Sequence, residues 1–256
     1  MITVWSYSKL STWTRCPAQF RFRYLEQAPV ESVGAALLLG SAVHHGVQLI
    51  HSRRKLGLAV GLAEIQGSVT SFLEASVRHA EAPVEYPKTH TTLSATLDLS
   101  RRLIETYLAQ GPSGEVVVTE LELTHPIAWL PGLKLTGVVD RIESDEQGGL
   151  RVVELKTASK RLSQAELDAS DQVTIYALLL DLAGYPGVKL RYEVLTKAKR
   201  PHLLTMDTVR TPNHETRLLE RIDQVSRAVA SGVFPRVVAP QTCRGCAYRK
   251  RCGVSG

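Results

Sequence analysis

The spacing of apolar residues divides the chain into a helical first part and a second part that contains strands. Up to about residue 110, apolar positions recur at helical spacing, and the run Ala82–Pro87 interrupts them as a breaker. A short N-terminal helix is expected with Ser8 as its cap, while residues 31–39 resemble an apolar loop or strand lead-in. The longer predicted helices cover residues 40–56, 61–79 and 91–110.

From Glu115 onward the apolar period changes to two, which is typical of strands. A long helix is predicted from Ser163 to Ala183, because Ser163 and Glu166 have the spacing of a capping box. A final helix is expected over residues 212–231. The predicted strands cover residues 116–123, 137–142, 152–157, 188–196 and 202–209. Strands mixed with helices in this order predict an α/β fold with a mixed sheet flanked by helices.

The sequence shows no internal repeat and no clear linker, so we expect one folded unit over residues 1–256. Within it, residues 1–110 form a mainly helical part and residues 111–232 form the α/β core. Residues 233–256 form a basic, cysteine-rich tail.

Two of the predicted strands bring together charged residues of both signs. Asp140 lies near the end of the first strand, and Glu154 and Lys156 lie on the second, after the polar connection at residues 143–149. Side chains alternate along a strand, so Glu154 and Lys156 share a face that Leu155 does not. Two close carboxylates repel unless a cation lies between them, and hard oxygen ligands suit Mg²⁺ or Mn²⁺. This arrangement predicts a metal-dependent phosphodiester site.

The composition adds limits on partners and location. With 256 residues and 44% hydrophobic content, the chain can bury a sizeable core without disulfides. A net charge of +6 permits a polyanionic partner without establishing one. No stretch approaches the roughly 20 apolar residues of a membrane helix, and the N-terminus lacks a signal peptide's pattern. We therefore expect a cytoplasmic protein that does not bind membranes.

The four cysteines have an uneven distribution, with one near the N-terminus and three near the C-terminus. In a reducing compartment this pattern favours metal ligation over disulfides. Four thiolates are a complete set for a [4Fe–4S] cluster or for tetrahedral zinc, and ligand softness does not choose between these. Such a centre would hold the two ends of the chain together. The cysteines are Cys16, Cys243, Cys246 and Cys252.

Several short motifs occur in the order found in one nuclease family. They are Gly40-x3-His44, Gly137-x2-Asp140-Arg141-Ile142, Glu154-x-Lys156 and Gln172-x3-Tyr176. In this order they resemble the motifs of RecB-like nucleases in the PD-(D/E)xK superfamily. The cysteine layout resembles the iron–sulfur branch of that family, which includes the AddB nuclease domain and the CRISPR-adaptation nucleases. The resemblance covers essentially the whole chain and favours the iron–sulfur cluster over zinc.

The resemblance implies roles for individual side chains. It implies a catalytic metal bound by His44, Asp140, Glu154 and the main-chain carbonyl of Leu155. It also implies that Lys156 positions the attacking water and offsets the charge of the transition state. His45 would point about 100° away on a helix, so only His44 fits the motif. Gly40 is read either as room for close backbone approach or as a helix-start glycine.

Gln172 and Tyr176 are four residues apart and share one helix face, beside the active site if the resemblance holds. Candidate DNA contacts are less specific. Arg141 could contact phosphate or pair with a neighbouring carboxylate, and the basic residues near Lys197 could equally form a solvated turn. Arginines interleaved with aromatics before residue 25 could stack on bases and pair with phosphates, or form the basic face of a helix. The candidate contacts are Arg21, Arg23, Arg141, Lys197 and Arg249.

The function expected from these observations is hydrolysis of DNA phosphodiesters with Mg²⁺ or Mn²⁺. The family resemblance implies an exonuclease on single-stranded DNA, or on DNA with free ends, with a 5′ to 3′ direction. The chain has no Gly-x4-Gly-Lys-Ser/Thr loop, so a helicase would be a separate partner. The alternatives are a CRISPR-adaptation nuclease that trims spacers and a non-catalytic iron–sulfur DNA-binding module. The sequence does not indicate the oligomeric state.

Overall fold

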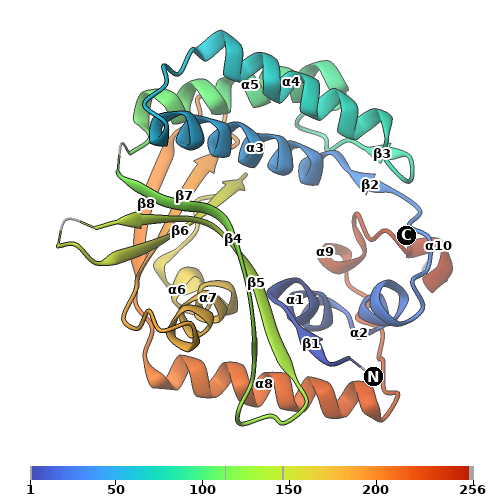
Figure 1. Ribbon diagram of the computed structural model, residues 1–256. Helices are drawn as coiled ribbons and strands as arrows, with labels where there is room; N and C mark the ends of the chain where they lie inside the picture. The colour runs from blue at the N-terminus through green and yellow to red at the C-terminus, as the bar shows by residue number, and fades with distance from the viewer. Residues whose placement is uncertain (1, 113, 146, 254–256) are drawn as a thin grey trace.

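The computed structural model describes residues 2–112, 114–145 and 147–253, and it shows a mixed sheet between two layers of helices (Figure 1). The strand order is β1-β5-β6-β7-β8, and β4 pairs with β5 outside this path. This confirms the predicted mixed α/β fold. Residue 146 of the predicted strand connection and residues 254–256 of the predicted tail lie outside the described residues. The division of the chain at residues 110 and 232 stays an interpretation.

The structure contains all five predicted strands, and the ends of each strand differ from the predicted ends by at most three residues. They are β4 (Val116–Pro126), β5 (Lys134–Ser144), β6 (Leu150–Ala158), β7 (Lys189–Thr196) and β8 (Leu203–Thr208). Three two-residue strands were not predicted, because two residues show no period. They are β1 (Val4–Trp5), which pairs in parallel with β5, and β2 (Val33–Gly34) and β3 (Val84–Glu85), which pair with each other.

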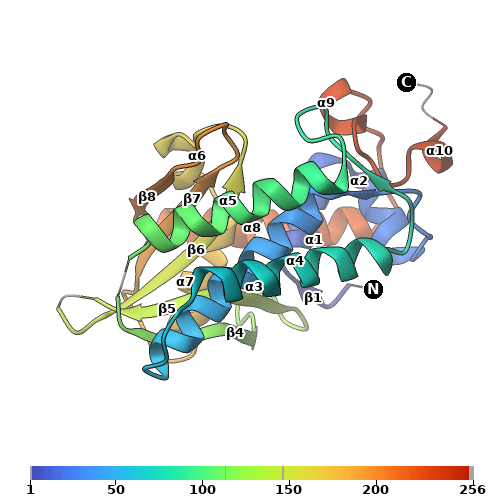
Figure 2. The same ribbon diagram turned by 90° about the horizontal axis from the view of Figure 1, so that it is seen from above.

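Three helices cover one face of the sheet, as Figure 2 shows from above. They are α3 (Ala35–Lys55), α4 (Leu62–Arg78) and α5 (Leu93–Gln110). Their apolar residues form one core cluster with Leu155 of β6 and Leu195 of β7. The predicted start of α3 at Gly40 is wrong, because the chain becomes helical at Ala35, directly after the extended Gly34. A side chain at Gly40 would meet only Thr157 Oγ1 at 3.7 Å, an ordinary contact, so neither proposed reason for this glycine holds.

The opposite face packs against α1 (Tyr7–Arg15), α7 (Asp171–Leu182) and α8 (Pro212–Ala230). Ser6, not the predicted Ser8, caps α1. The capping box of Ser163 and Glu166 is confirmed, but the single helix predicted over 163–183 is wrong. It divides into α6 (Gln164–Asp168) and α7. Arg210 stabilises the break, because its Nη2 donates to the carbonyls of Leu167 and Ser170 at 2.9 and 3.1 Å.

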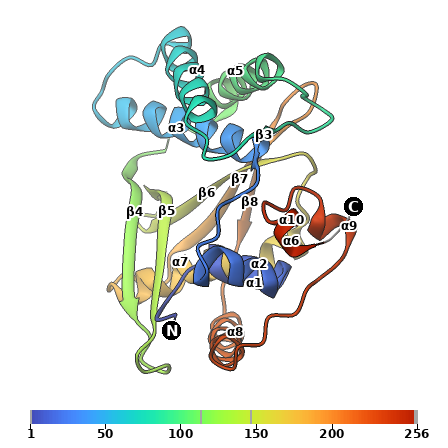
Figure 3. The same cartoon turned by 90° about the vertical axis from the view of Figure 1, so that its right-hand side faces the viewer.

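The two ends of the chain lie side by side, as Figure 3 shows for α1 and α2 beside α9 and α10. The N-terminal elements here are α2 (Pro17–Phe20) and the π-helix η1 (Arg21–Leu25), and the C-terminal ones are α9 (Pro240–Cys243) and α10 (Arg249–Cys252). Phe22 and Tyr248 join Cys16 in a small apolar cluster. The backbone amide of Glu31 donates to the carbonyl of Ala247 at 2.8 Å, which fixes the two segments to each other.

In the described part of the chain, none of the helices is both long and apolar enough to cross a membrane.

Candidate functional site

Strand β5 changes partners along one of its edges, and Asp140 lies at the change. Near its start β5 pairs with β1 at Lys134 and Leu135, and from Arg141 onward it pairs with β6. Strands β5 and β6 therefore separate at Asp140, and after Val153 the β6 backbone no longer pairs with β5. We call this point the fork. Asp140 Oδ2 accepts a hydrogen bond from the Leu155 amide at 2.9 Å and replaces the missing strand contact.

Four of the predicted site residues meet at this fork. His44 of α3 places its Nδ1 3.4 Å from Asp140 Oδ1. On β6, Lys156 Nζ lies 2.5 Å from Glu154 Oε1. Leu155 contacts Asp140 through its amide, so the predicted role of its carbonyl as a metal ligand stays a prediction. The structure thus brings together side chains from a helix and two strands that are far apart in the sequence.

Glu154 is the most constrained acid of the group. It is 1% exposed, and its Oε2 has no hydrogen-bond partner among the residues that the structure describes. Burial and the negative charge of Asp140 raise the pKa of Glu154 while Lys156 lowers it, and the net result is a pKa of about 7. A buried carboxylate oxygen without a partner is costly. A divalent cation beside Glu154 and Asp140 would remove this cost, so the residues present fit such an ion.

His44 and Asp140 form an ion pair in the absence of a cation. Burial alone would lower the pKa of His44, but the hydrogen bond and the charge of Asp140 raise it overall. Burial would raise the pKa of Asp140, but the contact with His44 lowers it overall. A metal ligand must be the neutral imidazole, so binding a cation here would release the His44 proton. The neighbouring His45 instead contacts Ser68 Oγ at 2.9 Å, which agrees with its predicted different direction.

Lys156 connects the acids to the predicted helical pair. Its Nζ donates to Gln172 Oε1 at 2.6 Å, and Gln172 Nε2 donates to the Tyr176 hydroxyl at 2.9 Å. Burial alone would lower the pKa of Lys156, but the Glu154 carboxylate raises it overall, so the ammonium stays charged. Gln172 and Tyr176 therefore hold the lysine in place.

Gly137 has a steric reason to be glycine. A side chain at this position of β5 would lie 3.1 Å from Tyr176 Cε1 and 3.2 Å from Leu179 Cδ1. These distances are shorter than ordinary carbon contacts, so a larger residue would push the tyrosine ring away from the strand. Glycine in this motif thus lets the Tyr176 ring pack directly on the strand that carries Asp140.

Within residues 2–112, 114–145 and 147–253, no three His, Cys, Asp or Glu side chains are already placed to hold a metal ion. Lys156 is bonded to Glu154, and His44 faces Asp140 at hydrogen-bonding distance. The residues with ligand chemistry for it are His44, Asp140 and Glu154.

We expect the affinity for Mn²⁺ to increase between pH 6 and 8, because a cation competes with the protons of Glu154 and His44. Titration calorimetry at the two pH values measures this. Without a divalent cation, the stability should change in the opposite sense. The folded protein keeps the Glu154 proton up to about pH 7, whereas the unfolded chain loses it near 4.5, so the free energy of unfolding falls across this range. Equal Mn²⁺ affinity at both pH values would contradict these protonation states.

Arg141 is not available to DNA, and its predicted phosphate contact is corrected. It is 2% exposed and donates to Glu143 Oε1 at 2.7 Å and Glu193 Oε1 at 2.5 Å. Its Nη1 also donates to the Tyr107 hydroxyl at 3.0 Å, and Tyr107 donates to Glu193 Oε2 at 2.8 Å. The alternative that Arg141 pairs with neighbouring carboxylates is the one that the structure supports.

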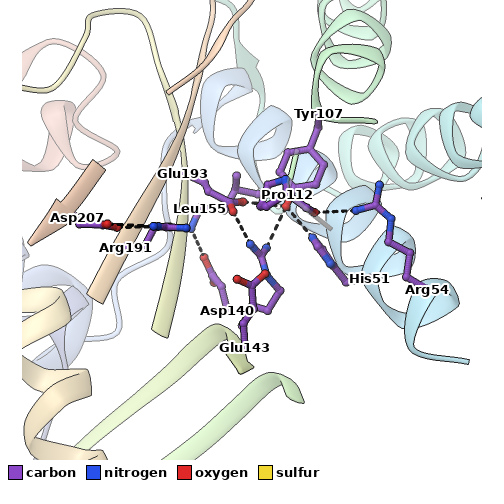
Figure 4. Close-up of polar contacts among 11 residues, drawn as sticks. His51, Arg54, Tyr107, Pro112, Asp140, Glu143, Leu155, Arg191, Glu193 and Asp207 are labelled. Carbon is purple, nitrogen blue, oxygen red and sulfur yellow. Dashed lines mark hydrogen bonds and ion pairs between the residues drawn. The ribbon is translucent and has the colours of Figure 1, made fainter. Parts of the chain in front are cut away.

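His51 completes this buried network, which Figure 4 shows between α3, α5 and the sheet. Its Nε2 lies 2.6 Å from the Tyr107 hydroxyl. Since that hydroxyl already donates to Glu193, His51 Nε2 must be the donor. Burial lowers the pKa of His51 to about 3, so the ring is neutral. This network has no signal in the sequence, because its members lie on the four separate elements α3, α5, β5 and β7.

A groove of about 590 Å³ opens beside Lys156 and Gln172. The Tyr7 ring of α1 forms one of its walls, with its centroid 5.9 Å from Lys156 Nζ. Arg15 and Arg221 also line the groove, although Arg221 is paired with Asp171. The groove reaches the fork at Lys156, whose Nζ is bonded to Glu154.

The remaining predicted DNA contacts lie outside the lining of this groove. Arg21 pairs with Glu26 at 3.0 Å, and the exposed Arg23 lies over the Tyr24 ring. Lys197 is half-buried, which lowers the pKa of its ammonium. Arg249 is exposed beside the cysteines. The structure does not test whether these four side chains contact DNA.

All four cysteines line one small cavity of about 20 Å³ between the two ends of the chain. None of them forms a disulfide. Burial raises the pKa of Cys246, and the proximity of Cys16, Cys252 and Cys243 raises it further. Four sulfur atoms around one cavity match the donor chemistry of a metal centre, although they are not in position to hold an ion without some rearrangement. The iron–sulfur cluster therefore stays a prediction.

Comparisons with known proteins agree with this geometry. The sequence matches the family described as the PD-(D/E)XK nuclease superfamily over residues 4–253. A solved structure from Eubacterium rectale, described as a candidate exonuclease, has a TM-score of 0.59 and 15% identity. That match covers 99% of this chain and 90% of the other, and it shows the fold alone. The solved structure of SSO0001 matches at 17% identity over 96% of this chain and 94% of the other, but its TM-score of 0.39 carries no weight. No curated protein sequence matches.

Proposed function

The chain belongs to the PD-(D/E)XK nuclease superfamily, and from that premise we propose that it hydrolyses DNA phosphodiesters at the fork between β5 and β6. The observation that carries the proposal is the buried, unpartnered oxygen of Glu154 beside Asp140, His44 and Lys156. Three groups with ligand chemistry and a charged lysine are the parts that metal-assisted phosphodiester hydrolysis needs. The ion is Mg²⁺ or Mn²⁺, because carboxylate oxygens prefer these cations.

A cation held by Asp140, Glu154 and His44 supplies a Lewis acid for a phosphate oxygen and lowers the pKa of a water molecule. The chain's own residues supply the rest. Glu154 raises the pKa of Lys156, which favours a charged ammonium that stabilises negative charge on the phosphate over a role as the base. Gln172 fixes the lysine through its Oε1 and is itself fixed by Tyr176. This chain of hydrogen bonds orients the ammonium before substrate arrives, which reduces the reorganisation required in the transition state.

The groove beside Lys156 supports a preference for single-stranded DNA. Its Tyr7 ring gives a nucleotide base a surface for stacking. Arg15 and Lys156 line the same groove, where their positive charges would pair with phosphates. A single strand can bend into such a groove from a free end, and we propose exonuclease action in the 5′ to 3′ direction. Repair, recombination or phage DNA processing in the cytoplasm is the proposed setting, with a separate helicase as partner. No described side chain is placed to read base edges, so cleavage should depend little on sequence.

Incubating the protein with 5′-labelled and 3′-labelled single strands tests the function. We expect Mn²⁺-dependent and Mg²⁺-dependent shortening of both substrates, with mononucleotides or short oligonucleotides released first from the 5′ label. EDTA should stop the reaction, and a circular single strand should resist it. Absence of cleavage with either cation would refute the proposed activity, whereas cutting of the circle would refute the exonuclease mode alone.

We also propose that the four cysteines hold a [4Fe–4S] cluster that joins the ends of the chain. Their common cavity and the mutual repulsion of thiolates support a cationic centre there, with zinc as the alternative. The exposed Arg249 lies beside the cavity, so the cluster would also order one basic wall. The role is structural, because the cysteines do not contact the acids at the fork.

Protein purified without oxygen should be brown, with iron and sulfide each near four per chain. The Cys16→Ser variant should lose the colour and unfold at a lower temperature, because the N-terminal segment is then released from the tail. Its residual folded fraction should still bind Mn²⁺ at the fork. Colourless protein with one zinc per chain would show that the cysteines bind zinc and not an iron–sulfur cluster. If the protein contains no metal and the Cys16→Ser variant is equally stable, both the cluster and the zinc site are rejected.

Two alternatives share features with the proposed function. A CRISPR-adaptation nuclease would have the same cysteine layout and would trim spacer DNA with a partner protein. A non-catalytic iron–sulfur DNA-binding module would keep the fold without the reaction, but here Asp140, Glu154 and Lys156 are all present. The assay on labelled strands separates the second alternative from the proposed function.

A further inference from the structure

A third acidic side chain lies beside the proposed metal site, on strand β4, which pairs with β5. The β4–β5 ladder pairs Thr119 with Arg141 and Leu121 with Val139, which places Glu120 opposite Asp140. Residues opposite each other in an antiparallel ladder point to the same face and lie about 5 Å apart. Neither the sequence motifs nor the family resemblance assigns Glu120 a role.

The backbone at Glu120 has an unusual conformation. Its φ is +53°, in the left-handed region that residues with a side chain rarely adopt, and it lies inside a strand. The strand thus turns locally at the residue that faces Asp140. Partial burial raises the pKa of Glu120, and Asp140 raises it further while His44 opposes this, which agrees with a position close to both.

The charges at the fork are unbalanced when Glu120 is included. At pH 8, where Glu154 is ionised, Glu120, Asp140 and Glu154 carry three negative charges, and Lys156 carries one positive charge. With neutral His44, as metal ligation requires, two negative charges remain, which equals the charge of one divalent cation. The unpartnered Oε2 of the buried Glu154 is an independent sign that the group lacks a positively charged partner.

On these grounds we propose that Glu120 is a further acidic residue of the metal site, contacting the cation held by Asp140 and Glu154 either directly or through a water molecule. The inference rests on the proposed function, because it requires a cation at the fork. The Glu120 residue is exposed as a whole, so its side chain is not fixed by packing on all sides. Glu120 would then increase the metal affinity, although it is not one of the motif residues His44, Asp140, Glu154 and Lys156.

The test measures Mn²⁺ binding by calorimetry and by electron paramagnetic resonance, without DNA. We expect E120Q to weaken binding about tenfold or more, as loss of a residue that supports a metal site does. The matched control is E122Q on the same strand, since Glu122 pairs with the apolar Val138 and should leave the affinity unchanged. The variant D140N should lose binding altogether. Unchanged affinity of E120Q overturns the inference while leaving the proposed function intact.

A second variant covers the case in which E120Q folds poorly. Glycine accepts a φ of +53° without strain, so E120G should melt at the same temperature as the unsubstituted protein or higher, and should still bind Mn²⁺ more weakly. Unchanged Mn²⁺ affinity in E120G would equally overturn the inference. If the unsubstituted protein binds no Mn²⁺, the proposed function fails, and the inference fails with it.

Discussion

Replacing Glu154 by glutamine or Asp140 by asparagine should lower the rate of DNA cleavage by about three orders of magnitude or more. Each change removes a charged ligand from the cation and leaves the shape of the side chain nearly unchanged. The expected loss is in turnover at saturating DNA, because the groove that binds the strand is not altered. Single-turnover cleavage of a labelled strand, with Mn²⁺ varied at each step, measures the effect.

The same two variants should differ in stability, which separates chemistry from folding. Burial raises the pKa of Glu154 to about 7, so at pH 8 the folded protein holds an ionised carboxylate under an energetic penalty. Glutamine removes that penalty, and E154Q should unfold at the same temperature as the unsubstituted protein or higher. Asp140 accepts the Leu155 amide and faces His44, so D140N should be somewhat less stable. An inactive E154Q with a lower unfolding temperature would indicate a structural role for Glu154 instead.

Replacing Arg141 by methionine should lower the free energy of unfolding by about 3–5 kcal/mol. Glu143 and Glu193 would then be buried without their partner, and they are 1% and 0% exposed. The network joins β5 and β7 to Tyr107 of α5 and His51 of α3, so its loss should also loosen the helix that carries His44 (Figure 4). Chemical denaturation in urea measures the change.

The chain offers a matched control in Arg191, which also pairs a strand arginine with an acid. Its Nε lies 2.6 Å from Asp207 Oδ1, but Asp207 has a side chain that is 65% exposed. An ion pair near the surface contributes less than about 1 kcal/mol, so Arg191→Met should have little effect. If the Arg141 and Arg191 variants lost the same stability, the buried network would not be what fastens the helical layer to the sheet.

Local pattern was enough to predict most of the elements. The five longer strands and the helices from residue 61 to 110 follow from apolar periods long enough to be distinct. The errors occurred where a local signal competed with a tertiary one. The capping box at Ser163 correctly began a helix, but the break before α7 is stabilised by Arg210, which is far along the chain and donates to the carbonyls of Leu167 and Ser170.

The same distinction applies to the site. The sequence alone was enough to nominate candidate residues for the chemistry, because Asp140, Glu154 and Lys156 lie on two predicted strands and His44 fits a motif spacing. Alternation also placed Glu154 and Lys156 on one face, and their contact confirms it. The structure brings the four cysteines to one cavity, although the identity of any metal there stays a prediction.

Only the tertiary structure decided what each charged group faces. Arg141 follows Asp140 directly, yet it is buried in the network with Tyr107 and is neutralised by Glu193, 52 residues away. Glu120 reaches the fork because β4 pairs in one particular register with β5. Electrostatic energy depends on distance through space and on burial, and neither is contained in the spacing of residues along a chain. The sequence therefore named the acids and the lysine, and the fold determined which of their neighbours serve the site and which hold the protein together.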